Sequence, residues 1–225
     1  MNDKSFLFFR LGPFSIPNQI LAEELPKRFQ NYGVRIVDIK KEILAHPHIL
    51  LINLIFTIIE YNKKLTSRGF KIRKAFLGTS FLFWWIKRLA GEKAKSENVI
   101  FTFQTESMYD ASIEGIPNFV YTDHTHLANI TYPDFEPKRL RPQVWIDLEK
   151  TIYKNAKRIL TRSSNITRSL VEQYNVPNEK IVCVGAGSNL QALPQKIKNN
   201  YTGKNIIFVG IDWQRKGGPN LVLAF

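Results

Sequence analysis

Short apolar runs, each bounded by turn-forming residues, recur along this chain and limit its fold more than any other feature. They lie at residues 6–9, 34–39, 99–103, 119–122, 158–161, 181–184 and 206–209. Each run suits a buried strand of a parallel sheet, because such strands are covered on both faces. Stretches with helical spacing of apolar residues lie at 17–30, 143–156 and 163–174. The alternation predicts an α/β fold with a doubly wound, mostly parallel sheet.

Length and charge narrow the class of protein. The chain has 225 residues, of which 44% are hydrophobic, and this is enough to fill one sizeable core. The formal net charge of +13 implies attraction to polyanions. Nucleic acid, an anionic membrane surface and a phosphorylated small molecule all remain candidates on charge alone.

The single cysteine and the apolar segments bear on the compartment. Cys183 lies in an apolar run at 180–184, where we expect a buried strand thiol, and a lone cysteine excludes disulfides within the chain. The run at 6–9 is shorter than the roughly seven residues of a signal-peptide core. The longest apolar run, at 49–59, is too short to span a membrane. We expect a cytoplasmic protein, with peripheral contact at the inner face of the membrane as an option.

A change of composition suggests where one domain ends. Residues 185–202 are rich in Gly, Asn, Gln, Lys and Pro, which is typical of a linker. We expect a first domain at 1–190, an interdomain linker at 191–203, and the start of a second domain at 204–225. The last segment reads as a strand and a helix that begins near Pro219. One strand and two helical turns bury too little surface to offset the backbone entropy, so we expect this second domain to be truncated.

The order of several motifs carries a resemblance to a known family. The motifs are GPFSIPN at 12–18, YTDHTH at 121–126, AKRILTRS at 156–163, KIVCVGAGSN at 180–189 and FVGIDWQRKGG at 208–218. This series resembles family 4 glycosyltransferases, which have the GT-B fold of two facing Rossmann-like domains. The resemblance implies an N-terminal, acceptor-side Rossmann-like domain followed by the opening βα unit of the nucleotide-sugar-binding domain.

The resemblance also implies an activity. Family members are hexosyltransferase-like enzymes that transfer a sugar from a nucleotide-diphosphate sugar to a hydroxyl, here with retention and with a lipid-linked or polysaccharide acceptor. No cofactor is implied, since the nucleotide-diphosphate sugar is a substrate. The family's paired-glutamate motif lies further into the second domain, so we expect the chain alone to be inactive.

Two glycine-containing segments are candidate substrate-binding sites by the same resemblance. Arg215, Lys216 and Gly217 precede the final helix, where free backbone N–H groups favour a diphosphate. The family usually has arginine directly after the strand's glycine, where this chain has Ile211, so Arg215 is the candidate substitute. Gly12 occupies the place of the family's glycine-rich loop after the first strand, although a plain turn glycine would need no function.

Residues 123–126 follow a predicted strand, where open α/β sheets bind ligands. By resemblance His124 contacts the donor sugar and is catalytic together with Asp123, while Thr125 supports substrate binding. A structural, hydrogen-bonded histidine is one alternative. A metal site that uses His126 as well, in a different α/β enzyme, is another. Neighbours on an extended chain point to opposite faces, so we expect no metal.

Residues 61–95 combine many cations with an aromatic stretch at 75–86. Such a segment suits the headgroup region of an anionic membrane, and a lipid-linked acceptor would fit with it. In that case the chain could also be a non-catalytic, basic membrane-surface module. The aromatic residues could instead simply cover the sheet. Nucleic acid is the least favoured partner, because no recognisable DNA- or RNA-binding module surrounds the segment.

Overall fold

Six parallel strands form one sheet in the order β2-β1-β3-β4-β5-β6. In chain order they are β1 (Ser5–Arg10), β2 (Gly33–Asp38), β3 (Val99–Thr105), β4 (Asn118–Thr122), β5 (Arg158–Thr161) and β6 (Ile181–Cys183). The chain runs outward from β1 to β2 and then returns to the other side of β1 at β3. The α/β arrangement is consistent with a Rossmann-like fold, and it puts all the carboxyl ends of the strands at one edge.

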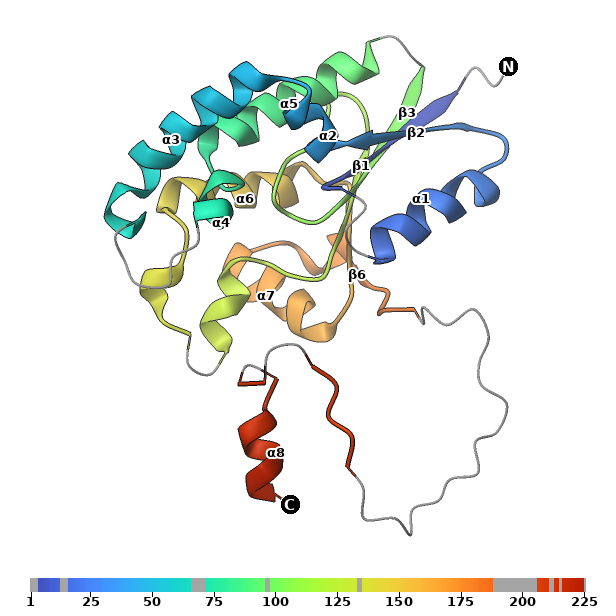
Figure 1. Ribbon diagram of the computed structural model, residues 1–225. Coiled ribbons are helices and arrows are strands. Elements are labelled where there is room, and N and C mark those ends of the chain that lie inside the picture. Colours follow the sequence, from blue (N-terminus) through green and yellow to red (C-terminus); the bar gives the residue numbers. More distant parts are fainter. Residues whose placement is uncertain are drawn as a thin grey trace, which may run out of the picture. The chain divides into compact units, whose positions relative to one another are not determined.

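The structure is a computed structural model that describes residues 4–12, 16–65, 72–95, 98–132, 135–187, 206–210, 213–214 and 216–224 (Figure 1). Within these ranges it leaves out the side chains of residues 16, 63, 65 and 74. The chain forms two compact units, Met1–Asn189 and Leu190–Phe225. The whole sheet belongs to the first unit.

Helices connect most of the strands and cover both faces of the sheet, while β3 is joined to β4 without a helix. In Figure 1, α1 lies on one side of β1 and β2, and α3 and α5 lie on the other. The helices are α1 (Ile16–Arg28), α2 (Ile39–Leu44), α3 (Pro47–Leu65), α4 (Ile72–Phe76), α5 (Ser80–Ala94), α6 (Gln143–Asn155), α7 (Ser164–Tyr174) and, in the second unit, α8 (Gly218–Ala224). Short 3-10 turns lie at Leu127–Thr131, Pro137–Arg139 and Asn178–Lys180.

Strand β1 shows how the core is divided between the two faces. Its residues 6–9 are all fully buried, and alternate side chains point to opposite sides. Leu7 and Phe9 join the core cluster that α2 and α5 cover. Phe6 stacks on Phe101 of β3, at 4.4 Å between ring centroids, and meets Phe29 just after α1 edge-on. Burial on both faces explains why this strand has no polar alternation in its sequence.

Most predicted elements of the first unit are confirmed. The predicted strand at 158–161 is β5 residue for residue, and Ser163 caps α7 by accepting a hydrogen bond from the backbone N–H of Ile166. The prediction for Cys183 is wrong, because its side chain is exposed. Cys183 is the last residue of β6. This strand lies at the edge of the sheet and therefore has a neighbouring strand on one side only.

The second unit departs from the predicted pattern in one respect. Residues 206–210 form no strand, although Val209 and its neighbours are apolar. A strand needs a partner for its backbone groups, and the described part of this unit offers none. The predicted helix is confirmed as α8, with Pro219 in its first turn. The predicted linker at 191–203 lies outside the described residues.

The aromatic stretch at 75–86 mostly enters the core. Leu82, Phe83 and Ile86 of α5 are buried, whereas Trp84 is 57% exposed. The alternative in which these residues cover the sheet therefore accounts for most of them. Within the described ranges, no helix combines the length and hydropathy that crossing a bilayer requires.

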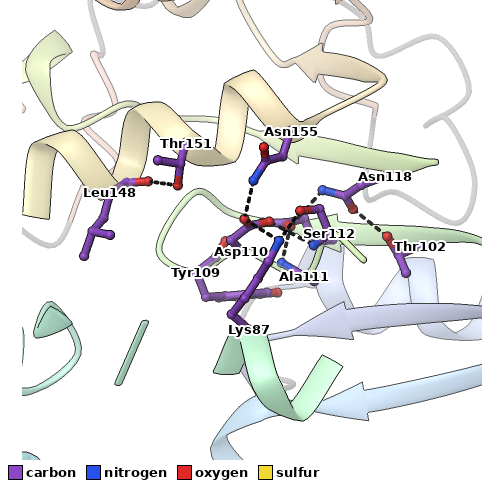
Figure 2. A network of polar contacts seen from close by, with 11 residues as sticks. Lys87, Thr102, Tyr109, Asp110, Ala111, Ser112, Asn118, Leu148, Thr151 and Asn155 are labelled. Atoms are coloured by element: carbon purple, nitrogen blue, oxygen red, sulfur yellow. Dashed lines mark hydrogen bonds and ion pairs between the residues drawn. The ribbon is translucent and has the colours of Figure 1, made fainter. Parts of the chain in front are cut away.

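A buried acid ties α5 and α6 to the loop after β3 (Figure 2). Asp110 is 1% exposed, and its Oδ2 lies 2.8 Å from both Lys87 Nζ and Asn155 Nδ2. Its Oδ1 accepts a hydrogen bond from the backbone N–H of Ser112 at 2.9 Å. The carboxylate is thus satisfied by two helices and its own loop, which fixes the path of the chain after β3.

We expect Asp110→Ala to destabilise the protein by about 2–3 kcal/mol, because it leaves the partly buried Lys87 ammonium without its counter-charge. Urea unfolding measures the loss. Glu92→Ala is the matched control, since it breaks the exposed pair with Arg88 and should cost less than about 0.5 kcal/mol. Equal losses in the two variants would contradict the role given to Asp110.

Candidate functional site

A cavity of about 170 Å³ opens at the carboxyl ends of β3 and β4. Ionisable side chains predominate in its lining: Glu106, Asp123, His124, His126, Arg141 and Glu149. Ligands of open α/β sheets bind at this edge. The concentration of ionisable groups in one hollow marks it as the candidate site of the first unit.

The site lies next to the point where the strand order reverses, between β1 and β3. Gly12 follows β1 with a positive φ of 79°, a conformation that favours glycine. Its carbonyl accepts a hydrogen bond from Asn18 Nδ2 at 3.4 Å, and Asn18 also hydrogen-bonds the Glu106 side chain. The loop after β1 thereby supports the acid that follows β3, although Gly12 itself does not line the cavity.

Glu106 is the most unusual residue of the site. It has a left-handed backbone with φ of 73°, which is strained for a residue with a side chain. Its N–H donates to the Tyr121 carbonyl at 2.8 Å, which holds that conformation. Burial, reinforced by the negative charge of Asp123, raises the pKa of Glu106 to about 7, while the bond to Asn18 opposes the shift. Glu106 can therefore gain or lose a proton near neutral pH.

His124 is held in place through both its backbone and its ring. Its carbonyl accepts hydrogen bonds from Thr122 Oγ1 at 2.6 Å and Ser107 Oγ at 3.0 Å. Its Nε2 lies 2.9 Å from Asn129 Nδ2, and its ring stacks on Tyr132 at 6.3 Å between centroids. Burial lowers the pKa of His124 below its ordinary value, so the ring is neutral at physiological pH. Because Nε2 accepts from the Asn129 amide, the neutral ring carries its proton on Nδ1 and can donate one hydrogen bond to a ligand.

The two residues beside His124 have different environments. Asp123 is 58% exposed, and its Oδ2 lies 3.4 Å from Arg162 Nη1, just after β5. Thr125 is fully buried, with its hydroxyl 2.6 Å from that of Ser169 on α7. Thr125 thus anchors the loop to α7, whereas Asp123 remains open to a ligand.

Helix α6 supplies the opposite wall. Glu149 is 1% exposed, and its Oε1 accepts hydrogen bonds from the His126 N–H and the Tyr153 hydroxyl, each at 3.0 Å, while its Oε2 accepts one from Tyr174. Burial raises the pKa of Glu149 to about 7 against these donors. Its partners are all structural, so we assign Glu149 to support of the loop that carries His126.

Arg141 brings a cation to the same wall. Its guanidinium carbon lies 4.0 Å from the centroid of the Trp145 ring, which is a cation–π contact. Its backbone N–H donates to His126 Nε2 at 2.7 Å, which leaves the other ring nitrogen of His126 to carry the proton. The guanidinium can therefore offer charge to an anionic or hydroxylated ligand without moving the histidine.

The structure brings together only part of the predicted site. His124 and Asp123 line the cavity, Thr125 packs behind it, and Gly12 reaches it indirectly through Asn18. Lys216 and Gly217 belong to the second unit, where they precede α8, and Arg215 lies outside the described residues. Their predicted role as a diphosphate site stays a prediction.

The residue pattern does not single out Glu106 and Arg141. Glu106 follows β3 directly, just as Asp123 follows β4, so the rule that points to Asp123 could also have indicated it. Arg141 carries no comparable signal, because it precedes α6 in an irregular segment. Among the described residues, no group of three or more His, Cys, Asp or Glu side chains has the geometry of a metal site.

We expect Glu106→Gln to change the pH dependence of stability. The folded-state pKa of Glu106, about 7, lies above the value of 4.5 for a free side chain, so its favourable contribution is present below pH 4.5 and is lost as pH rises through 7. Glutamine does not titrate, so the variant does not lose this contribution. Between pH 5 and pH 8 its free energy of unfolding, relative to that of the wild type, should therefore increase by up to about 3 kcal/mol. Urea unfolding at both pH values measures the difference. If the free energies of unfolding of variant and wild type differ by the same amount at both pH values, the raised pKa of Glu106 is contradicted.

We expect Asp123→Asn to lower the pKa of both Glu106 and His124, because the charge of Asp123 raises each of them. The carboxyl carbon of Glu106 and the ring of His124, followed by NMR against pH, report the two values. Asp147→Asn is the matched control, since this exposed aspartate on α6 pairs with Lys150 and should leave both values unchanged. A shift in neither group would show that Asp123 does not share their environment.

The sequence was also compared with known proteins. It matches no family model and no curated protein.

Proposed function

We propose that this chain is the acceptor-side part of a GT-B glycosyltransferase, which transfers a sugar from a nucleotide-diphosphate sugar to a hydroxyl with retention of configuration. The observation that carries the proposal is the juxtaposition of His124, Asp123 and Glu106 in one cavity at the carboxyl edge of a parallel sheet. The motif series from residue 12 to residue 218 supports the same assignment.

The volume of the cavity fits a site that binds the sugar of a donor but not its nucleotide. Its volume of about 170 Å³ is smaller than the roughly 300–1,000 Å³ of pockets that enclose whole small molecules. It has room for one sugar-sized group but not for a whole nucleotide. A donor whose sugar enters this cavity would keep its nucleotide outside the cavity.

Each side chain of the cavity has a role that suits sugar transfer. The neutral ring of His124 would orient a sugar hydroxyl through a single hydrogen bond. Glu106, protonated in part near pH 7, would bind the acceptor hydroxyl and exchange its proton. Asp123 stays accessible at the mouth for a further hydroxyl. Rate acceleration would then come from positioning and from cations that stabilise the leaving diphosphate.

A transfer assay with labelled nucleotide-diphosphate sugars tests the proposal. The protein produced from its intact gene is mixed with lipid and glycan acceptors, and incorporation of label is measured. We expect His124→Ala to reduce kcat/KM by about 100-fold, the size of effect seen when one oriented hydrogen-bond donor is removed. Because Glu172 is exposed on α7, away from the cavity lining, Glu172→Ala should transfer at the wild-type rate.

Circular dichroism and thermal unfolding of both variants distinguish a lost contact from a lost fold. Transfer at the wild-type rate by a folded His124→Ala variant would remove His124 from the mechanism. No transfer from any nucleotide-diphosphate sugar would overturn the proposed activity.

A further inference from the structure

Helix α3 has its polar residues on the inside and its apolar residues on the outside. Asn53, Thr57 and Tyr61, spaced four residues apart, are 0%, 0% and 1% exposed. The outward side carries large aliphatic side chains that are 38–67% exposed: Leu51, Ile52, Leu54, Ile55, Ile58 and Ile59. A surface helix of a water-soluble protein normally has the reverse arrangement. We call these six residues the α3 outer face.

Directional hydrogen bonds fix this orientation. Asn53 Nδ2 donates to the Phe76 carbonyl at 2.7 Å, and the Tyr61 hydroxyl donates to the Gly78 carbonyl at 2.6 Å. Glu60 accepts a hydrogen bond from the Ser80 N–H at 3.1 Å. A rotation of the helix that buried the aliphatic residues would break all three contacts. The α3 outer face is therefore a stable feature of the surface.

Neighbouring helices add exposed apolar side chains near α3. Phe56 of α3 stacks on Phe81 of α5 at 5.1 Å, and Trp85 contacts His46 just before α3. Trp84 lies three residues after Phe81 on α5 and is 57% exposed. Ile72 of α4, the helix to which Asn53 bonds, is 55% exposed. A helix face with six exposed aliphatic side chains is apolar surface of the kind that marks an interaction site.

The charges of the sequence segment that contains α3 favour an anionic partner. Between residues 43 and 91 Glu60 is the only acid in the sequence, and it is directed toward Ser80. The same segment carries many cations: Lys63, Lys64, Arg68, Lys71, Arg73, Lys74, Lys87 and Arg88. Exposed Arg73 on α4 and Lys40 and Lys41 on α2 place cations on the helices that follow and precede α3.

Two occupants could cover such a face, and charge decides between them. A second copy of this chain would bring an identical set of cations to the interface, and the two sets would repel. An anionic bilayer would attract the cations and accept the aliphatic side chains below its headgroups. A helix with an apolar face and flanking cations can lie in the plane of that interface without crossing it.

We propose that α3 docks this protein on anionic lipid bilayers, with the α3 outer face inserted and the neighbouring cations against the headgroups. The surface differs from the aromatic stretch at 75–86, which is mostly buried. The proposal does not depend on sugar transfer, because docking can be measured without any sugar nucleotide.

Co-sedimentation with vesicles tests the proposal. The full chain should bind vesicles of mixed phosphatidylcholine and phosphatidylglycerol, bind pure phosphatidylcholine much less, and lose binding as salt is raised. The double variant Ile55→Glu/Ile58→Glu should bind at least about tenfold less, since two charges would enter the apolar layer. Arg73→Glu should weaken binding to the anionic vesicles only.

The matched control is Val171→Glu/Val182→Glu, which places two charges at exposed valines of α7 and β6 and should bind as the wild type does. Circular dichroism checks that both double variants are folded. Equal sedimentation of the wild type and Ile55→Glu/Ile58→Glu would overturn the proposal. A wild-type dimer that this variant dissociates, with no vesicle binding, would assign the face to a second copy instead.

Discussion

The pairing of β3 with β4 positions the side of the candidate site that carries Glu106 and Asp123. Their parallel register sets Thr105 opposite Tyr121, and the Glu106 N–H extends the pairing by one bond to the Tyr121 carbonyl. The chain then turns through a left-handed conformation at Glu106 instead of continuing the strand. This turn directs the acid toward the residues that follow β4. Without that register, Asp123 would not be close enough to Glu106 for its negative charge to raise the pKa of Glu106.

The sheet could be predicted from sequence because strands buried on both faces leave continuous apolar runs. The same rule failed at Cys183, since an apolar run does not reveal that its strand lies at the edge. It failed again at residues 206–210, where the described part of the second unit offers no strand for these apolar residues to pair with. Of the site, Asp123 and His124 could be found by their place after a strand. The backbone turn at Glu106 has no glycine to announce it, and its pKa depends on neighbours far away in sequence.

Buried polar groups explain the orientation of α3, which its hydrophobic pattern alone does not predict. Its hydrophobic pattern implies that the aliphatic stripe faces the core, but the inward side carries Asn53 and Tyr61, which donate hydrogen bonds, and Glu60, which accepts them from Ser80. Each of these groups would be costly to bury without a partner, so their contacts outweigh the burial of isoleucine. Tertiary hydrogen bonds, and not the hydrophobic pattern, therefore decide which side of α3 is buried.

The inward side of α3 also reaches the cavity wall. A methyl group at Gly78 would lie 2.8 Å from both the Tyr61 hydroxyl and the guanidinium carbon of Arg141, so these two side chains converge on a glycine that leaves them room. Lys64, near the end of α3, donates to the carbonyl of Leu140, the residue before Arg141. The position of Arg141 in the cavity therefore depends on how α3 is seated. Helix α3 therefore contributes to the cavity from its inward side through the surroundings of Arg141, while its outer face carries the exposed aliphatic residues.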